Sequence, residues 1–201
     1  MNDQKLKEAM KVIHLSPVGI ASWPKLNEPD TKFNPDGTYE VNLLVPEGDL
    51  DKIGSAVETV QQGSMKNNFF KEDLDSEGNP TGKYLVKFKM KAIVRPRNSK
   101  AFTQKPILVD ANGDRMFDKI GGGSRIEVKY TVAPYDAFGG GVSLRLKAVR
   151  VLDLVQPGGD VGEWGETEGT YQASGEPEVP EGSDGELTKE QFEAACDAHN
   201  F

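Results

Sequence analysis

The stretch YLVKFKMKAIV, residues 84–94, decides the fold class of this chain of 201 residues. Its apolar and basic residues alternate with a period of two, which is typical of a β-strand with one buried and one solvated face. The buried face would hold Phe88 and the other apolar residues, and the solvated face would hold Lys87, Lys89 and Lys91. The stretch therefore predicts a sheet that is packed on one side and basic on the other.

The same alternation recurs along the chain on both sides of this stretch. The earliest strand is expected to be interrupted at Pro17 and Gly19, as happens at an edge or a bulge. Short strands at 107–109 and 115–117 would flank the turn DANGD, whose Asn-Gly pair favours a hairpin. At 148–151 the alternation changes phase, which predicts a bulge. The main strands are expected over residues 12–22, 38–45, 84–94, 125–132 and 142–154.

One helix is expected among these strands, from about residue 50 to residue 62. Its apolar residues recur every three or four positions, and Asp49 would cap its N-terminus. Residues 69–82 are acidic and rich in turn formers, so we expect a solvated loop there. A calcium site in that loop is the alternative, although the twelve-residue calcium-loop pattern is not met. Together these elements predict a mainly β fold, a five-stranded OB-fold-like barrel with one capping helix.

The charges divide the chain into two parts of opposite sign. Residues 1–156 carry 23 basic and 20 acidic side chains, whereas residues 157–201 carry Lys189 and 12 carboxylates. The net charge of −8 therefore describes neither part. Residues 157–186 consist mainly of Gly, Pro, Glu, Ser and Thr and lack the apolar surface needed to form a core. We expect a folded domain over 1–156 and a disordered acidic tail over 157–201.

Several classes of protein are disfavoured by the same sequence. No apolar run is long enough to span a membrane and the charged start does not resemble a secretion signal, so we expect a cytoplasmic protein without a membrane partner. The chain has one cysteine, Cys196, and two histidines, which do not make a zinc cage. His14 is expected to pack in a strand. The glycine triplets at 121–123 and 139–141 lack the phosphate-loop spacing. We expect neither cofactor nor metal, and no enzymatic activity.

The candidate site is an array of outward cations with aromatic residues close to them. Cations can follow a phosphate chain, and exposed rings can stack on unpaired bases whatever their identity, which is how single strands are bound without sequence preference. Glu127 interrupts this array. The expected DNA-binding residues are Trp23, Lys87, Lys89, Lys91, Arg95, Arg97, Lys100, Phe102, Arg125, Lys129, Tyr135, Phe138, Arg145 and Lys147.

The end of the tail has a pattern of its own. Thr188 and Gln191 are spaced as in a capping box, and Leu187 and Phe192 as in a hydrophobic staple, which predicts a short helix near the C-terminus. The chain ends on the aromatic residue Phe201. An exposed terminal ring after an acidic stretch favours docking, so we expect Phe192 and Phe201 to bind a protein partner.

Three stretches together resemble a known family. The opening SPVGIASWPKL (16–26), the close GVSLRLKAVRVLDL (141–154) and the acidic tail ending in Phe201 are similar to the OB-fold single-stranded DNA-binding proteins of short-tailed bacteriophages. The resemblance implies binding and protection of single-stranded DNA in replication, recombination or repair. It also implies that the protein often forms a homodimer, and that its tail contacts replication proteins such as DNA polymerase or helicase and competes with DNA. The family's binding face would correspond to the basic strand positions named above. The capping-box segment departs from a simple acidic tail.

Two other functions stay open from the residues alone. In the first, the barrel is a protein-interaction module of a phage or bacterium, and binds protein or carbohydrate while the tail docks a partner. In the second, the protein is an enzyme that acts on DNA with a metal ion. Preference for oligo-dT over heparin would argue against the former, and metal-independent binding without turnover against the latter.

Overall fold

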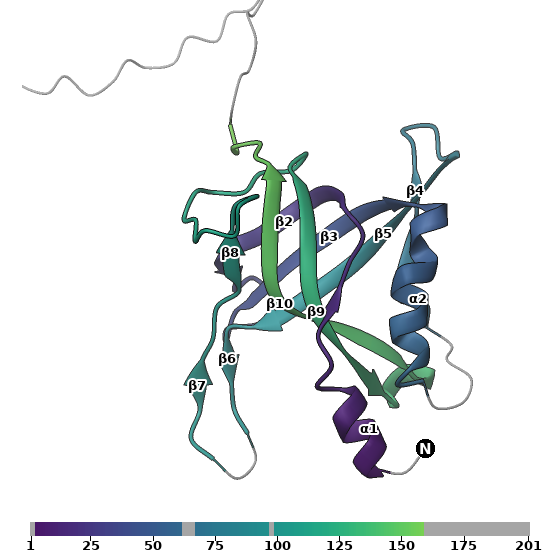
Figure 1. Cartoon of the computed structure of the whole chain (residues 1–201), viewed down its shortest axis with the longest axis vertical. Helices are drawn as coiled ribbons and strands as arrows, with labels where there is room; N and C mark the ends of the chain where they lie inside the picture. The colour runs from purple at the N-terminus through teal and green to yellow at the C-terminus, as the bar shows by residue number, and fades with distance from the viewer. Residues whose placement is uncertain (1–2, 62–66, 97–98, 159–201) are drawn as a thin grey trace, which may run out of the picture. The chain divides into compact units, whose positions relative to one another are not determined.

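A computed structural model describes residues 3–61, 67–96 and 99–158 of the chain (Figure 1). The expected tail, its terminal helix and the two tail phenylalanines lie outside these residues. The described part contains two α-helices, two short 3₁₀ helices and strands from two to 13 residues long. In chain order the elements are α1 (Asp3–Ala9), β1 (His14–Leu15), β2 (Gly19–Asp30), β3 (Thr38–Pro46), η1 (Glu47–Asp49), α2 (Leu50–Glu58), β4 (Phe70–Leu74), β5 (Pro80–Lys91), β6 (Ile93–Val94), β7 (Phe102–Thr103), β8 (Ile107–Val109), β9 (Arg125–Tyr135), η2 (Ala137–Gly139) and β10 (Gly141–Asp153).

Five strands pair in a ring, in the order β2, β3, β5, β10, β9 and back to β2. The seam between β3 and β5 is long and antiparallel, with register pairs from Thr38 opposite Lys91 to Pro46 opposite Lys83. Two other seams are short. β2 meets β9 through two register pairs, and β5 meets β10 in parallel through two. The ring is therefore only partly closed, as in an OB-fold-like barrel, and the expected fold class is confirmed.

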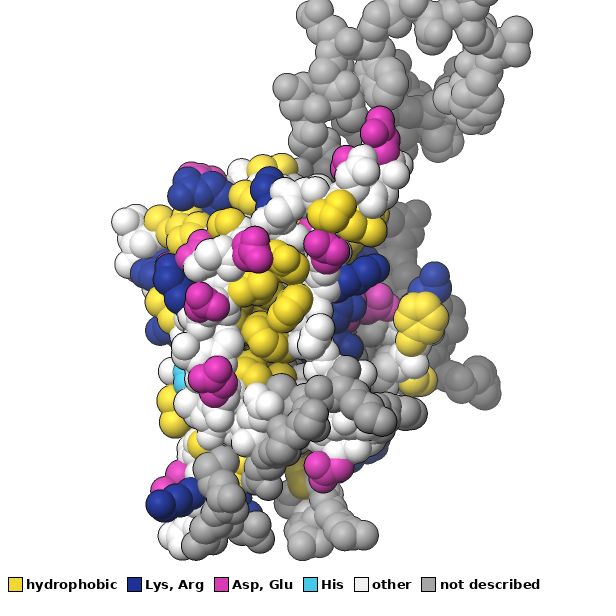
Figure 2. Space-filling model, turned by 90° about the vertical axis from the view of Figure 1, so that its right-hand side faces the viewer, with side chains coloured by type: hydrophobic (Ala, Val, Ile, Leu, Met, Phe, Trp, Pro, Cys, Tyr) yellow, Lys and Arg dark blue, Asp and Glu magenta, His cyan; other side chains and the backbone are white. Residues whose placement is uncertain are grey.

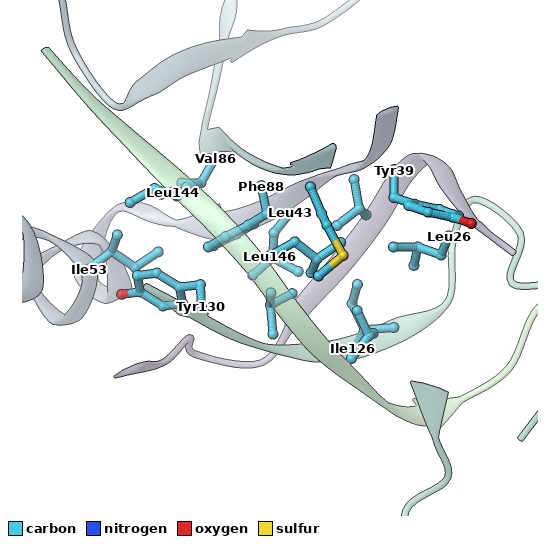
Figure 3. Close-up of a cluster of buried hydrophobic side chains, with 14 of the residues drawn as sticks. Leu26, Tyr39, Leu43, Ile53, Val86, Phe88, Ile126, Tyr130, Leu144 and Leu146 are labelled. Atoms are coloured by element: carbon cyan, nitrogen blue, oxygen red, sulfur yellow. The ribbon is translucent and has the colours of Figure 1, made fainter. Parts of the chain in front are cut away.

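The core fills the ring, as Figure 3 shows for its largest side chains. In β5, Val86, Phe88 and Met90 are buried, whereas the three lysines between and after them are exposed. The expected alternation is therefore confirmed for residues 86–91, but the strand expected over 84–94 ends at Lys91, and Ile93–Val94 form the separate strand β6. The hydroxyl of Tyr130 is buried without a hydrogen-bond partner, and burial raises the pKa of this phenol to about 12.

The expected break in the first strand is present and has a steric cause. β1 and β2 are separate strands, and both pair with β9. Gly19 opens β2 where a Cβ atom would lie 2.6 Å from the carbonyl oxygen of Leu44, so a larger residue does not fit. The bulge expected at 148–151 is also present, since the register of β9 and β10 shifts between Leu146 and Ala148.

Helix α2 follows β3 as expected, but its N-terminus differs from the prediction. Ile53, Ala56 and Val57 are buried and join the core. Asp49 makes no capping hydrogen bond. Its carboxylate instead accepts a hydrogen bond from Lys52 Nζ at 2.8 Å, so the predicted cap is wrong.

Two more segments depart from the sequence-based expectations. The acidic stretch 69–82 is not a loop, because β4 and the start of β5 form a hairpin across it. Around the Asn-Gly turn, β8 is present, but residues 115–117 contribute a single bridge between Val109 and Arg115 rather than a strand. Helix α1 was not expected, because it is only seven residues long and carries several charges.

A second hairpin, β6–β7, extends from the C-terminal end of β5, and we call its described residues, 93–96 and 99–103, the arm. In Figure 1, β5 runs diagonally from the β4 hairpin at the upper right to the base of the arm at the lower left. No helix within the described ranges is long and apolar enough to span a membrane.

Candidate nucleic-acid interface

The outer faces of β5 and β10 form one basic surface at their short parallel seam. Lys89 lies in register with Arg145, while the buried Phe88 and Leu144 form the preceding pair. Adjacent strands are about 4.8 Å apart, so the two cationic side chains rise side by side. Lys91 and Lys147, each two residues further along its strand, are also exposed. Four predicted cations from two distant parts of the sequence are thus neighbours.

These four cations line a groove of about 510 Å³ between the seam and the arm. Among the described residues that line it there is no aspartate or glutamate, so its charge is wholly positive. The groove residues are Thr38, Lys89, Met90, Lys91, Val94, Phe102, Gln104, Ser143, Arg145, Leu146 and Lys147. Sequence reasoning missed Thr38, Gln104 and Ser143, which carry no charge or ring. Thr38 and Ser143 reach the groove through strand pairing, and Gln104 through hydrogen bonds to the carbonyl oxygens of Lys91 and Ala92.

Two predicted aromatic residues lie near the two ends of this basic surface. Phe102 of β7 is 49% exposed and lines the groove. Tyr135 is 38% exposed and ends β9, in register with Gly141 at the start of β10. A Cβ atom at Gly141 would lie 2.5 Å from the hydroxyl oxygen of Tyr135, so the ring rests against the bare backbone of this glycine. From Gly141 to Lys147 β10 spans roughly 20 Å at about 3.3 Å per residue.

Trp23 is the exposed ring with the most unusual backbone. Its side chain is 80% exposed, and its φ of 50° is positive, which among the described residues is otherwise seen only at glycines. The residue sits where the register of β2 against β3 shifts between Ser22 and Lys25. Such a conformation costs a bulky residue about 1–3 kcal/mol and is concentrated at functional sites. The bulge turns the indole into solvent instead of into the core.

Other predicted cations are already engaged by carboxylates. Lys87 lies 3.5 Å from Glu40 on the neighbouring strand. Arg95 makes two hydrogen bonds to Asp36, of 3.0 and 2.7 Å, which lower the pKa of that carboxyl group. A third predicted cation, Arg125, pairs with Asp153 across β9 and β10.

Beyond the bulge, the outer face of β9 and β10 differs from the groove. Glu127, which was expected to interrupt the basic face, forms an ion pair with Arg150, a residue not predicted for the site. Lys129 is exposed on the same strand, but it is not among the groove residues. The structure therefore separates Arg125 and Lys129 from the groove cations.

The remaining predicted site residues are only partly described. Lys100 is exposed on the arm. Arg97 and the two tail residues, Phe192 and Phe201, lie outside the described residues, as does the side chain of Phe138.

Acidic residues also lie on other faces of the domain. Figure 2 shows the face that carries α2 and β4, where acidic side chains are scattered among hydrophobic, basic and uncharged ones. The carboxylate of Asp75 accepts hydrogen bonds from the backbone of Glu77 and Asn79, which lower the pKa of Asp75. Within the described ranges no group of three or more Asp, Glu, His or Cys residues could hold a metal ion.

Comparisons with known proteins agree with a nucleic-acid interface. No protein-family model matches the chain. The single-stranded DNA-binding protein of Escherichia phage T7 is 30% identical over 194 residues, covering 82% of this chain and 84% of that protein. The single-stranded DNA-binding protein of Enterobacteria phage T3 is 29% identical over 189 residues, covering 79% of this chain and 82% of that protein.

Solved structures lead to the same family. The crystal structure of gp2.5, a single-stranded DNA-binding protein encoded by bacteriophage T7, matches with a TM-score of 0.58 and 28% identity, over 81% of this chain and 99% of that one. A C-terminally truncated single-stranded DNA-binding protein from bacteriophage Enc34 matches with a TM-score of 0.50 and 14% identity, over 71% and 86%, which shows the fold alone. With its sequence and its ring of strands both matched, the chain belongs to the family of phage single-stranded DNA-binding proteins.

Proposed function

We propose that this chain binds single-stranded DNA with little sequence preference, and that the groove beside the β5–β10 seam is the centre of the binding site. The supporting observation is a groove whose charged lining residues are all cations and whose lining also contains an exposed aromatic ring. The phosphates would lie along Lys89, Arg145, Lys91 and Lys147, while unpaired bases would stack on Phe102. Both contacts are indifferent to base identity, so sequence would matter little.

The arrangement also favours a single strand over a duplex. In a duplex the base faces are stacked on one another, so the ring of Phe102 has no free base to contact. A single strand can offer phosphates to the lysines and turn its bases towards the ring. Stacking of one base on an aromatic side chain contributes about 1–3 kcal/mol, which is enough to account for the preference.

The outlying predicted residues complete the proposed path. Tyr135 would receive a base at the hairpin end of β10, and Trp23 would offer a further ring at the bulge of β2. Lys87, Arg125 and Lys129 would add to the positive field, although carboxylates hold two of them. Lys100, Arg97 and Phe138 are kept in the proposed site as expectations from the sequence.

The tail has a separate proposed role. The domain of residues 1–156 would bind DNA, and residues 157–201, with 12 carboxylates against one lysine, would compete for the same cations. Phe192 and Phe201 would anchor replication proteins such as a polymerase or a helicase, while the acids steer the encounter. The protein would thus act in phage DNA replication, recombination or repair, by binding instead of by catalysis.

The test is a titration of the full chain with labelled oligo-dT, with a matched duplex and at two salt concentrations, read by fluorescence anisotropy. We expect tighter binding to oligo-dT, without metal or nucleotide. The slope of log affinity against log salt should be about −0.7 for each phosphate that is neutralised. Equal affinity for the duplex, or a slope near zero, would contradict the proposal. A chain that ends at residue 156 should bind more tightly at low salt if the tail competes with DNA.

A further inference from the structure

The ion pair of Asp36 with Arg95 connects the arm to the ring. Arg95 Nε and Nη2 donate hydrogen bonds of 3.0 and 2.7 Å to the two carboxylate oxygens of Asp36. Two parallel bonds fix the orientation of the guanidinium as well as its distance. Within the described ranges, this is the one ion pair between the arm and the rest of the domain.

Asp36 belongs to a turn that is itself firmly built. The turn joins β2 to β3, and its backbone is held by Asn34, whose side-chain oxygen accepts a hydrogen bond from Asp36 N at 3.2 Å. Gly37 has a φ of 75° and lies so close to Ala92 that a Cβ atom would be 3.2 Å from the Cβ of that residue. Gly37 O also accepts a hydrogen bond from Ala92 N at 2.9 Å. The carboxylate therefore projects from a fixed support at the base of the arm.

The arm itself has few other attachments. At its base, Gln104 N and Gln104 Nε2 donate hydrogen bonds to the carbonyl oxygens of Ala92 and Lys91, at 2.8 and 2.9 Å. Beyond that point β6 and β7 pair only with each other, through two register pairs, one of which joins Val94 to Phe102. Arg95 directly follows Val94, so the ion pair acts next to the residue that lies opposite the groove aromatic.

We propose that Asp36 is a positioning residue for DNA binding, because it holds Arg95 and so fixes the arm that presents Phe102 to the groove. This inference rests on the proposed function. Arg95 then contributes to DNA binding by holding the arm in place, instead of by contacting a phosphate. A ring that is already in place loses less conformational freedom when a base stacks on it, and preorganisation of this kind increases affinity.

Removal of the Asp36 carboxylate should change DNA affinity in the opposite direction from the one that electrostatics alone would give. Asp36 is a negative charge close to a cationic groove, so by Coulomb's law alone its removal should strengthen the binding of a polyanion. If the carboxylate positions the arm, its removal should weaken binding. Glu40 supplies the matched control, because it is a carboxylate on β3 beside the same basic surface, and its partner Lys87 lies on β5 instead of on the arm.

The experiment compares full-length Asp36→Asn and Glu40→Gln with the unchanged chain, by anisotropy with labelled oligo-dT at two salt concentrations. We expect Asp36→Asn to bind about two- to fivefold more weakly, as suits an exposed but bidentate ion pair, and Glu40→Gln to bind as tightly as the unchanged chain or more tightly. The double exchange Asp36→Arg with Arg95→Asp should recover most of the loss caused by either single change, because it restores the pair.

Amide hydrogen exchange supplies a readout that does not depend on DNA. In Asp36→Asn, exchange should become faster in residues 99–104 and stay unchanged in β3 and β10. Binding by Asp36→Asn equal to or tighter than that of the unchanged chain, or unchanged exchange in the arm, would overturn the inference while leaving the proposed function intact. Failure of the unchanged chain to bind oligo-dT at low salt would instead overturn the proposed function.

Discussion

The two halves of β10 both carry cations but differ in what surrounds them. Arg145 precedes the bulge and Lys147 lies within it, and both face the groove, whose described lining contains no carboxylate. After the bulge, Arg150 is paired with Glu127, and Asp153 pairs with Arg125. A polyanion that binds after the bulge must displace a carboxylate, whereas one that binds before it needs only to displace solvent and mobile ions. The number of cations on a strand is therefore a poor guide to where a phosphate chain binds.

Charge reversal on either side of the β10 bulge should give the largest difference in DNA affinity. Lys89→Glu with Arg145→Glu places two like charges beside the proposed phosphate path, where repulsion costs several kcal/mol. We expect affinity for oligo-dT to fall by on the order of a hundredfold or more, measured by anisotropy. The matched pair Arg125→Glu with Arg150→Glu should change it by less than about fivefold. If both pairs of substitutions reduced DNA affinity equally, the distinction between the two sides of the bulge would be wrong. Circular dichroism should report a folded protein in both cases, since exposed positions contribute little to stability.

Removal of the groove ring should have the next largest effect. Phe102→Ala is expected to weaken binding by about five- to a hundredfold, which corresponds to the 1–3 kcal/mol of a lost base stack. The salt dependence should stay unchanged, because no cation is lost. Trp23→Ala tests the indole on β2, which is not adjacent to β5 or β10 in the ring of strands. If Trp23→Ala reduces DNA affinity more than Phe102→Ala does, the centre of the binding site lies away from β10.

A smaller effect is expected at the hairpin that begins β10. Gly141→Ala introduces a Cβ atom that would lie only 2.5 Å from the hydroxyl oxygen of Tyr135, so the tyrosine ring must move. If that ring stacks on a base, affinity should fall about threefold, and the variant Tyr135→Ala should show the same loss, without a further decrease in the double variant. Independent, additive losses would show that Gly141 acts in another way.

The smallest effect concerns the dependence of stability on pH. His14 of β1 lies opposite Tyr130 of β9, and burial lowers the pKa of the imidazole. Because the folded state disfavours the charged form, stability is fully present above the unfolded pKa of about 6.5 and is lost as pH falls below it towards the lowered folded value. The midpoint of thermal unfolding should drop between pH 7 and pH 5, and the drop should be smaller in His14→Phe. DNA affinity should not follow this titration, because His14 is not among the groove residues.

The parts of the fold that were predictable are those with a local signal. Alternation in residues 84–94 gave the buried and exposed faces of β5 correctly, and the change of phase at 148–151 indicated a bulge that lies just before these residues, between Leu146 and Ala148. The stretch 69–82 was misread as a loop because its acids and turn residues concealed β4, which is held by pairing with β5 and not by its own pattern.

The sequence allowed candidate site residues to be named but not their arrangement. The spacing of lysines predicts which of them face outwards on a strand. The carboxylates that pair with them, however, are distant in sequence. Asp36 is 59 positions from Arg95, and Glu40 is 47 positions from Lys87. The parallel contact of β5 with β10 has no local signal either, although it places Lys89 next to Arg145.

Single-stranded DNA bound at the short seam between β5 and β10 would also hold these two strands together. The residues that would hold the phosphates, Lys89 and Arg145, are also one of the two register pairs that join these strands. A polyanion that contacts both side chains would bridge a seam of the ring that has only two register pairs. By mass action it would favour the closed state, so the seam should open less often when DNA is bound. The same two positions would then set both the affinity for DNA and how firmly the seam is held while DNA is bound.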